Sequence, residues 1–427
     1  MKKIISALAL SAFAFGAVSA STKVSMNYRN GAYLMQYKND GEEKSTSSTT
    51  FGALNTYQAG QDSLALTASG DHLTFKATIQ PKLDSTLRFN QLSLAGKWGN
   101  FEDEIGWNGD GINGGYRVTN DASNWEGIFF ERWKLGSMFK LSTSQYADNQ
   151  VEVGNGQLFT NRIMFERAAY TIKADDLAIK LQGVIISDRG WKASNVDTEY
   201  NAGNKGWSAL VDVSKKGVFK AEAIVKGAEV GKTGKVVVNK GQTDGDGQAL
   251  AIGVYVQPLM VKGLIATVGG AVSVYDGEVT DWSADLRARY AVNDALSLTY
   301  YGKLSALTDS VDDNVVALST NIGFGSKTSI TTNTAMWNML NARYKVNDLI
   351  TASLNLSAVT DLKNKDDTNA GTTLGITPGA EFFAAKNATI TIGVNATFGG
   401  LGAEEKSAYK KEMDLGICVP VLFRVKL

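Results

Sequence analysis

The last fifteen residues of the chain alternate between apolar and other side chains. Every second residue from Met413 to Leu427 is apolar, and only Leu422 breaks the pattern on the other face. A period of two describes a strand with one apolar face, and this run is longer than the ~5 to 6 residues of an ordinary globular strand. About 9 to 11 residues of a tilted strand cross the hydrocarbon of a membrane. The C-terminal segment therefore predicts a membrane-spanning β-strand.

The same alternation recurs upstream in pairs of segments that short polar turns connect. The turns at 70–71 and 215–217 each separate two alternating runs, which indicates β-hairpins. Two further hairpins carry a near-repeat, Ala-Arg-Tyr-x-Val-Asn-Asp, at 288–294 and 342–348, and a looser third version spans 382–392. We interpret the repeat as a recurring barrel hairpin with its tyrosine near the membrane interface. Chance similarity between hairpins is the alternative.

Longer polar stretches lie between these hairpins, so short turns and long loops alternate along the chain. Outer-membrane barrels have this asymmetry, with short periplasmic turns and longer extracellular loops, and closure pairs every backbone amide around the ring. The sequence therefore predicts an all-β fold, a transmembrane antiparallel up-and-down β-barrel with an even strand number between about 16 and 22. Residues 315–335 form either a hairpin or a folded-in loop. The predicted loops are 38–61, 108–124, 146–158, 188–204, 230–247, 361–369 and 399–409.

The N-terminal twenty residues have the features of a secretory signal peptide. They contain two lysines, an apolar run too short to cross a bilayer as a helix, and small residues at the end. We expect cleavage near Ala20, which leaves residues 21–427 as one β-barrel domain in the bacterial outer membrane. Alternation starts within a few residues of Ser21, which argues against a plug domain and a gated, energy-coupled receptor.

Charge and cysteine content exclude other classes of protein. Removing Lys2 and Lys3 leaves 41 of the 43 basic residues against 43 acidic residues, a net charge of −2. This balance argues against nucleic acid as a partner. Cys418 is the only cysteine, so an exported chain has no internal disulfide.

The scarcity of histidine and cysteine, with one residue of each, argues against an enzyme and against a zinc site. His72 is the only histidine and directly follows a short turn, so we expect a solvated turn residue and not a catalytic base. Zinc sites need cysteine and histidine ligands. Residues 244–247 offer oxygen atoms for calcium but lack the rest of an EF-hand loop, and we interpret them as a polar loop. We expect no catalytic residue, cofactor or metal.

If the apolar face of each strand contacts lipid, the opposite face lines the lumen. Basic positions on that face outnumber the acidic ones, chiefly Glu222, Asp285 and Asp414, and a basic lining favours anions. The expected anion preference is weak, because several bases lie near strand ends and the alternation slips between Phe89 and Leu92, as at a bulge. The predicted lumen-lining bases are Lys76, Arg88, Lys97, Lys180, Lys220, Arg287, Lys303 and Arg343.

Four segments resemble a known family, the Gram-negative general porins. Residues 23–28, 74–80 and 89–101 are similar to the family's first strand, its third strand, and the strand and glycine turn before its constriction loop; residues 423–427 resemble its closing strand. The family usually ends in an aromatic residue and not in leucine. It often places an arginine where this chain has Trp107, which removes a pore charge from the comparison.

The resemblance implies a typically trimeric channel whose loop at 108–124 folds into the lumen and narrows it. The glycines of this loop permit tight bends. An ordinary surface loop rich in glycine and asparagine is the alternative. The residues that would line the constriction are Asp110, Tyr116, Arg117 and Asp121.

We therefore expect a porin that forms a water-filled channel for passive diffusion of small hydrophilic solutes and ions, as a homo-oligomer in outer-membrane lipid. One alternative is a substrate-specific channel of the sugar type, with Trp107, Tyr116 and Trp125 along the path. Another is a surface-displayed barrel that acts as an adhesin or antigen. Open channels on reconstitution favour the pore, solute-dependent current block favours the specific channel, and a closed barrel that binds a host ligand favours display.

Overall fold

The computed structural model describes most of the chain after residue 20. The fold and the site below concern these residues alone, so the predicted signal peptide and the predicted loop at 108–124 lie outside them. The described segments are 21–39, 44–48, 63–81, 87–107, 152–153, 156–157, 164–187, 205–229, 235–238, 241–244, 248–275, 278–307, 316–320, 328–332, 334–363, 371–401 and 415–427.

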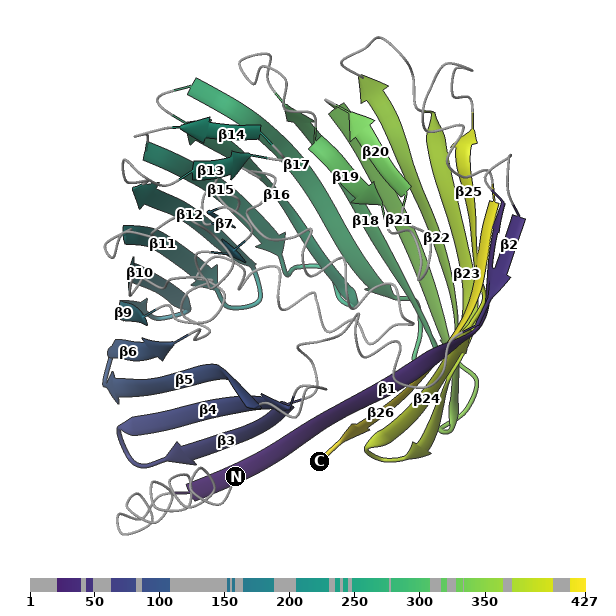
Figure 1. The fold of residues 1–427 in the computed structure, drawn as a ribbon. Helices are drawn as coiled ribbons and strands as arrows, with labels where there is room; N and C mark the ends of the chain where they lie inside the picture. Colours follow the sequence, from purple (N-terminus) through teal and green to yellow (C-terminus); the bar gives the residue numbers. More distant parts are fainter. Residues whose placement is uncertain are drawn as a thin grey trace.

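Every regular element in these segments is a β-strand (Figure 1). None of the described residues forms a helix long and apolar enough to cross a membrane. The main sheet contains β1 (Ser21–Asn39), β2 (Lys44–Ser47), β3 (Ser63–Ser69), β4 (Leu73–Pro81), β5 (Leu87–Trp98), β6 (Phe101–Trp107), β9 (Met164–Ala174), β10 (Leu177–Ser187), β11 (Lys205–Lys215), β12 (Phe219–Glu229), β15 (Gln248–Pro258), β16 (Leu264–Tyr275), β17 (Glu278–Ala291), β18 (Leu296–Leu307), β21 (Thr334–Lys345), β22 (Ile350–Lys363), β23 (Thr372–Ala385), β24 (Ala388–Gly393), β25 (Asn395–Leu401) and β26 (Leu415–Lys426).

The main sheet closes on itself. Each strand pairs antiparallel with the next one around the wall, and β26 pairs with β1 from Asn27 to Asn39. The sheet has twenty strands, but β2 and β3 lie along the same edge of β1, and β24 and β25 are one line interrupted at Val394. The ring thus has 18 positions, which confirms the predicted even number. Figure 1 shows the strands arranged side by side as a curved wall.

The two rims of the barrel differ in the length of their connections. One rim carries the tight turns, and β1 and β26 meet near it, since Met26 and Leu427 exchange two backbone hydrogen bonds of 2.8 Å. The connections at the other rim are mostly long, with 82–86 and 276–277 as short exceptions. This confirms the predicted alternation of short and long connections. The tight turns are at 70–72, 99–100, 175–176, 216–218, 259–263, 292–295, 346–349 and 386–387.

The near-repeat forms the same turn twice. The Asn293 side chain accepts backbone N–H bonds from Ala295 and Leu296, at 2.9 and 2.7 Å. Asn347 accepts the two equivalent bonds in the second turn, at 2.8 and 2.9 Å. Asparagine suits such turns because its side-chain oxygen satisfies backbone donors within the turn itself. The interpretation as a recurring hairpin turn is confirmed for these two copies, whereas the looser version at 382–392 has a shorter turn at 386–387; the place of the tyrosine near the membrane interface stays a prediction.

The two faces of the wall have opposite character. Aliphatic side chains stand exposed on the outer face: Val256 on β15 is 38% exposed and Val268, opposite it on β16, is 53% exposed. Positions between them carry polar and charged side chains on the inner face, such as Glu104, Gln182 and Asn341. A soluble protein rarely exposes so broad an apolar surface. An apolar band around a closed barrel with a polar interior is typical of membrane barrels.

Two outward-facing glycines accommodate large neighbouring side chains. The Trp98 ring occupies the space where a Cβ of Gly96 would be, and the Tyr300 ring does the same at Gly302. The Tyr300 hydroxyl donates a hydrogen bond of 2.7 Å to Asn338 Oδ1 on the adjacent strand β21. The hydroxyl group of Tyr300 and the amide oxygen of Asn338, both on the outer face, are therefore paired with each other.

Some sequence predictions need correction or are now decided. Parts of the predicted loops 146–158 and 230–247 form strands, because their backbones pair with each other: Val153 lies opposite Val236. Residues 315–335 contain a separate hairpin. The predicted slip in β5 is confirmed, since its register with β4 shifts at Asn90. The small sheets contain β7 (Glu152–Val153), β8 (Gly156–Gln157), β13 (Lys235–Val238) and β14 (Gly241–Asp244), and β19 (Val316–Thr320) with β20 (Thr328–Thr332).

Candidate functional site

A cluster of acidic and basic side chains lies on the inner face of β5, β6, β9 and β10. Lys180 Nζ lies 2.6 Å from Glu102 Oε2, and Lys97 Nζ lies 3.6 Å from Glu102 Oε1. Arg167 contacts Glu104 at 3.2 Å and Glu102 at 3.8 Å. We call these five residues the inner-wall charge cluster. Three positive charges thus meet two negative charges on one part of the wall.

Strand register explains how these side chains meet. Glu104 lies directly opposite Arg167 across β6 and β9, so their contact is a cross-strand pair. Glu102 lies opposite Ala169 on β9, and this small side chain leaves room for Lys180 to reach Glu102 from the next strand, β10. Glu104 and Arg167 are nearly enclosed, with side chains 5% and 11% exposed, whereas Lys97 is 70% exposed.

Uncharged polar side chains cover another part of the inner wall. Asn341 on β21 donates to Asn355 Oδ1 on β22, and Asn395 on β25 donates to Thr377 Oγ1 on β23 at 2.7 Å. All four residues are buried. Nearby, Arg343 reaches across β22 to Glu381 on β23, at 2.6 Å. In this second ion pair the carboxylate of Glu381 neutralises the positive charge of Arg343 on the inner face.

Ion pairs and the backbone register give the positions of the predicted basic residues in the wall. Lys97, Lys180 and Arg343 are the three that form the ion pairs described above. The backbone register places the rest on the same face: Lys76 opposite Ser93, Lys220 opposite Gln257, Arg88 opposite Gln80, Arg287 opposite Thr267, and Lys303 opposite Asp285. They are spread around the barrel and do not form one site.

The predicted constriction residues Asp110, Tyr116, Arg117 and Asp121 lie outside the described residues. Of the aromatic residues proposed for a sugar path, Tyr116 and Trp125 also lie outside the described residues. The backbone of Trp107 pairs with Leu92 and Met164, in the same alternation as Phe101 and Ile105, and its place along a sugar path stays a prediction.

Sequence reasoning missed the acidic half of the wall. Glu102 and Glu104 alternate with Phe101 and Ile105 on β6, so their inward orientation was readable from the pattern. Their partners were not readable, because β6 pairs with β9 across 56 intervening residues. Glu381 was missed in the same way. With these acids counted, the excess of basic charge on the inner face is smaller than the sequence predicts.

Among the described residues, the histidine and the cysteine do not form a second site. His72 lies exposed in the turn between β3 and β4, where its Nδ1 is 3.1 Å from the Lys97 carbonyl oxygen. Cys418 is buried on the inner face opposite Gln36. The described part of the chain contains no group of three or more His, Cys, Asp or Glu side chains placed to hold a metal ion.

Comparison with known proteins gives structural neighbours only. No protein-family model and no curated protein matches the chain. Solved structures of Gram-negative outer-membrane porins match it over about 96% of its length. The anion-selective porin from Comamonas acidovorans is 11% identical, covering 96% of this chain and 100% of its own, with a TM-score of 0.48.

Two other neighbours are similar at the same level. The outer membrane channel DcaP of Acinetobacter baumannii is 12% identical over 96% of this chain and 97% of its own, with a TM-score of 0.43. Salmonella typhi OmpF, in complex with daunomycin, is 12% identical over 95% and 97%, with a TM-score of 0.45. At such values the likeness adds nothing about function to what the strand pairings and the two faces of the wall show.

Proposed function

We propose that the protein is an outer-membrane porin, a water-filled channel through which small hydrophilic solutes and ions diffuse passively, and that it is not an enzyme. One observation carries the proposal. The strands close into a ring with an exposed apolar outer face and with polar and charged side chains inside. The outer face suits lipid, and the inner face suits water. Such a barrel needs no energy source to let solutes pass.

Location and assembly belong to the same proposal. The signal-peptide features of residues 1–20 support export, with cleavage near Ala20, and the short-turn rim then faces the periplasm. The resemblance to general porins supports a homotrimer. Cross-linking of the protein in native membranes checks this, with a trimer band as the expected result and a monomer as the contrary one.

The inner-wall charge cluster supports only a weak preference for anions. Lys97, Lys180 and Arg167 share the carboxylates of Glu102 and Glu104, and Arg343 pairs with Glu381. Paired charges produce a smaller local potential than isolated bases of one sign. Reversal potentials in a salt gradient measure the preference. A small shift toward anions is expected, and a clear preference for cations contradicts it.

Single-channel recording of the refolded protein in planar bilayers tests the function itself. We expect steady current steps whose size rises in proportion to salt concentration, as for ions in a wide aqueous path. A correctly folded barrel that never conducts contradicts the porin and favours a display role for the loops. Current that one sugar blocks at low concentration favours the substrate-specific channel.

A further inference from the structure

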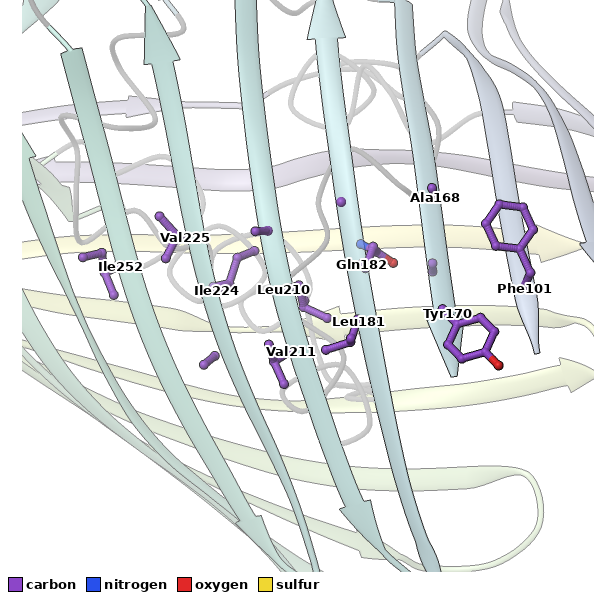
Figure 2. A pocket seen from close by; sticks show the side chains of 14 residues that line it. Phe101, Ala168, Tyr170, Leu181, Gln182, Leu210, Val211, Ile224, Val225 and Ile252 are labelled. Atoms are coloured by element: carbon purple, nitrogen blue, oxygen red, sulfur yellow. The ribbon is translucent and has the colours of Figure 1, made fainter. Parts of the chain in front are cut away.

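A groove crosses the outer face of the barrel from β6 to β15. It has a volume of about 490 Å³, and its lining is almost wholly apolar (Figure 2). Its floor is formed by the smallest outward-facing residues, among them Ala168, Gly183 and Ala209, which lie opposite one another on β9, β10 and β11. No atom comes within 4 Å of the place where a Cβ of Gly183 would be. The outer-face residues that line the groove are Phe101, Ala168, Tyr170, Leu181, Gly183, Ala209, Val211, Ala223, Val225 and Ile252.

A carboxylate borders the groove at its β6 end. Asp103 lies opposite Ala168, between the outward-facing Phe101 and Ile105. Its Oδ1 is buried beside Gly96 and has no hydrogen-bond partner among the described residues. The residue as a whole is only partly buried, so part of Asp103 is exposed on the outer surface. A charge on the lipid-facing side of a membrane barrel is costly unless a positive group meets it.

The groove rises from the membrane interface into the apolar band. Asp103 is two residues from the start of β6 at the short-turn rim, beside the stacked rings of Trp98 and Phe101. At the other end of the same row, Ile252 is six residues from the end of β15 at that rim, or about 20 Å along the strand. A molecule that followed the groove would have one end at headgroup level and the other in hydrocarbon.

We propose that the groove binds a phospholipid with an ammonium headgroup, of the ethanolamine type. The ammonium lies against the Asp103 carboxylate, and one acyl chain follows the row of small residues toward Ile252. Charge complementarity selects this occupant over an anionic lipid, and the apolar floor accepts its chain. The site rests on the membrane location in the proposed function but not on conduction, since it lies on the outer face.

Native mass spectrometry of the detergent-purified protein tests the site. The protein is incubated with equal amounts of dioleoyl phosphatidylethanolamine and dioleoyl phosphatidylglycerol. We expect preferential retention of the ethanolamine lipid. Asp103→Asn should lower that retention by at least about threefold without changing retention of the glycerol lipid, and Gly183→Leu, which fills the groove, should lower retention of both. Ala168→Leu serves the same purpose if Gly183→Leu does not fold.

Matched controls are Asp294→Asn in an exposed turn and Ala342→Leu on the outer face of β21, neither of which should change lipid retention. All variants should conduct as the unmodified protein does, which separates this site from the channel. Equal retention of the two lipids by the unmodified protein, or full retention by Asp103→Asn, would overturn the proposal. A shift from oligomer to monomer in Gly183→Leu, with lipid retention unchanged, would instead assign the groove to a second copy of the chain.

Discussion

Lys180 Nζ lies 2.6 Å from Glu102 Oε2, although the two residues are on strands separated by β9. Glu102 also lies within 4 Å of Lys97 and Arg167. One carboxylate thus balances three basic groups on the inner wall. The electrostatic potential at this part of the inner wall therefore depends on Glu102 more than on any single base.

Glu102→Gln should make the channel more selective for anions. The substitution keeps the size of the side chain but leaves Lys97, Lys180 and Arg167 with Glu104 as their only acid in the cluster, so the local potential becomes more positive. The reversal potential in a tenfold gradient of potassium chloride should move toward that of chloride. Asp348→Asn, in an exposed turn, should leave it unchanged. An unchanged reversal potential in Glu102→Gln would mean that the cluster does not face the ion path.

Arg167→Ala should destabilise the barrel strongly. Its partner Glu104 is nearly enclosed, 3.2 Å away, and would keep a buried charge without compensation. Removing one partner of a buried pair costs about 3 to 5 kcal/mol. Urea unfolding in lipid vesicles measures the loss. Lys97→Ala is the matched control, because Lys97 is 70% exposed and its loss should cost at most about 1 kcal/mol. Similar losses in the two variants would contradict the enclosed pair.

Tyr300→Phe should lower the stability of the barrel, because it removes a hydrogen bond between β18 and β21. The variant keeps the ring over Gly302 but removes the donor to Asn338 Oδ1, which then faces apolar surroundings alone. An unpaired group of this kind costs about 1 to 3 kcal/mol. The urea midpoint should fall by a corresponding amount. Tyr344→Phe, at an exposed outer-face position near the rim, should change it little, and an equal effect of both would contradict the account.

Asn293→Ala and Asn347→Ala should lower stability by equal amounts. Each removes a side-chain acceptor for two backbone N–H groups of its turn, which we expect to cost about 1 kcal/mol per turn. Since the turns lie apart, the double variant should show the sum. Thermal unfolding measures this. Loss in only one variant would show that the two turns are not equivalent.

Alternation along the chain was enough to assign faces to most strands. It placed Lys97, Lys180 and Arg343 inside and located a slip between Phe89 and Leu92, where the structure has the register shift at Asn90, because a period of two is a local property of the backbone. Tight turns could be identified for the same reason, since glycine and asparagine act within the turn itself.

Pairing between distant strands could not be predicted from the pattern. Nothing in the alternation of β6 indicates that β9 is its neighbour, and so the partners of Glu102 and Glu104 remained unknown. The groove on the outer face could not be predicted for the same reason. Ala168, Gly183 and Ala209 are unremarkable on their own strands, and only the register of three strands brings them into one row.

Thiol labelling of the open channel tests the central claim most directly. Lys97→Cys places a thiol on the inner face and Leu94→Cys places one on the outer face of the same strand, in a chain whose natural Cys418 is buried. A charged, water-soluble thiol reagent added to a conducting bilayer should lower the single-channel current of Lys97→Cys. It should leave the current of Leu94→Cys and of the unmodified protein unchanged. A drop in both variants, or in neither, would contradict a water-filled lumen bounded by a lipid-facing wall.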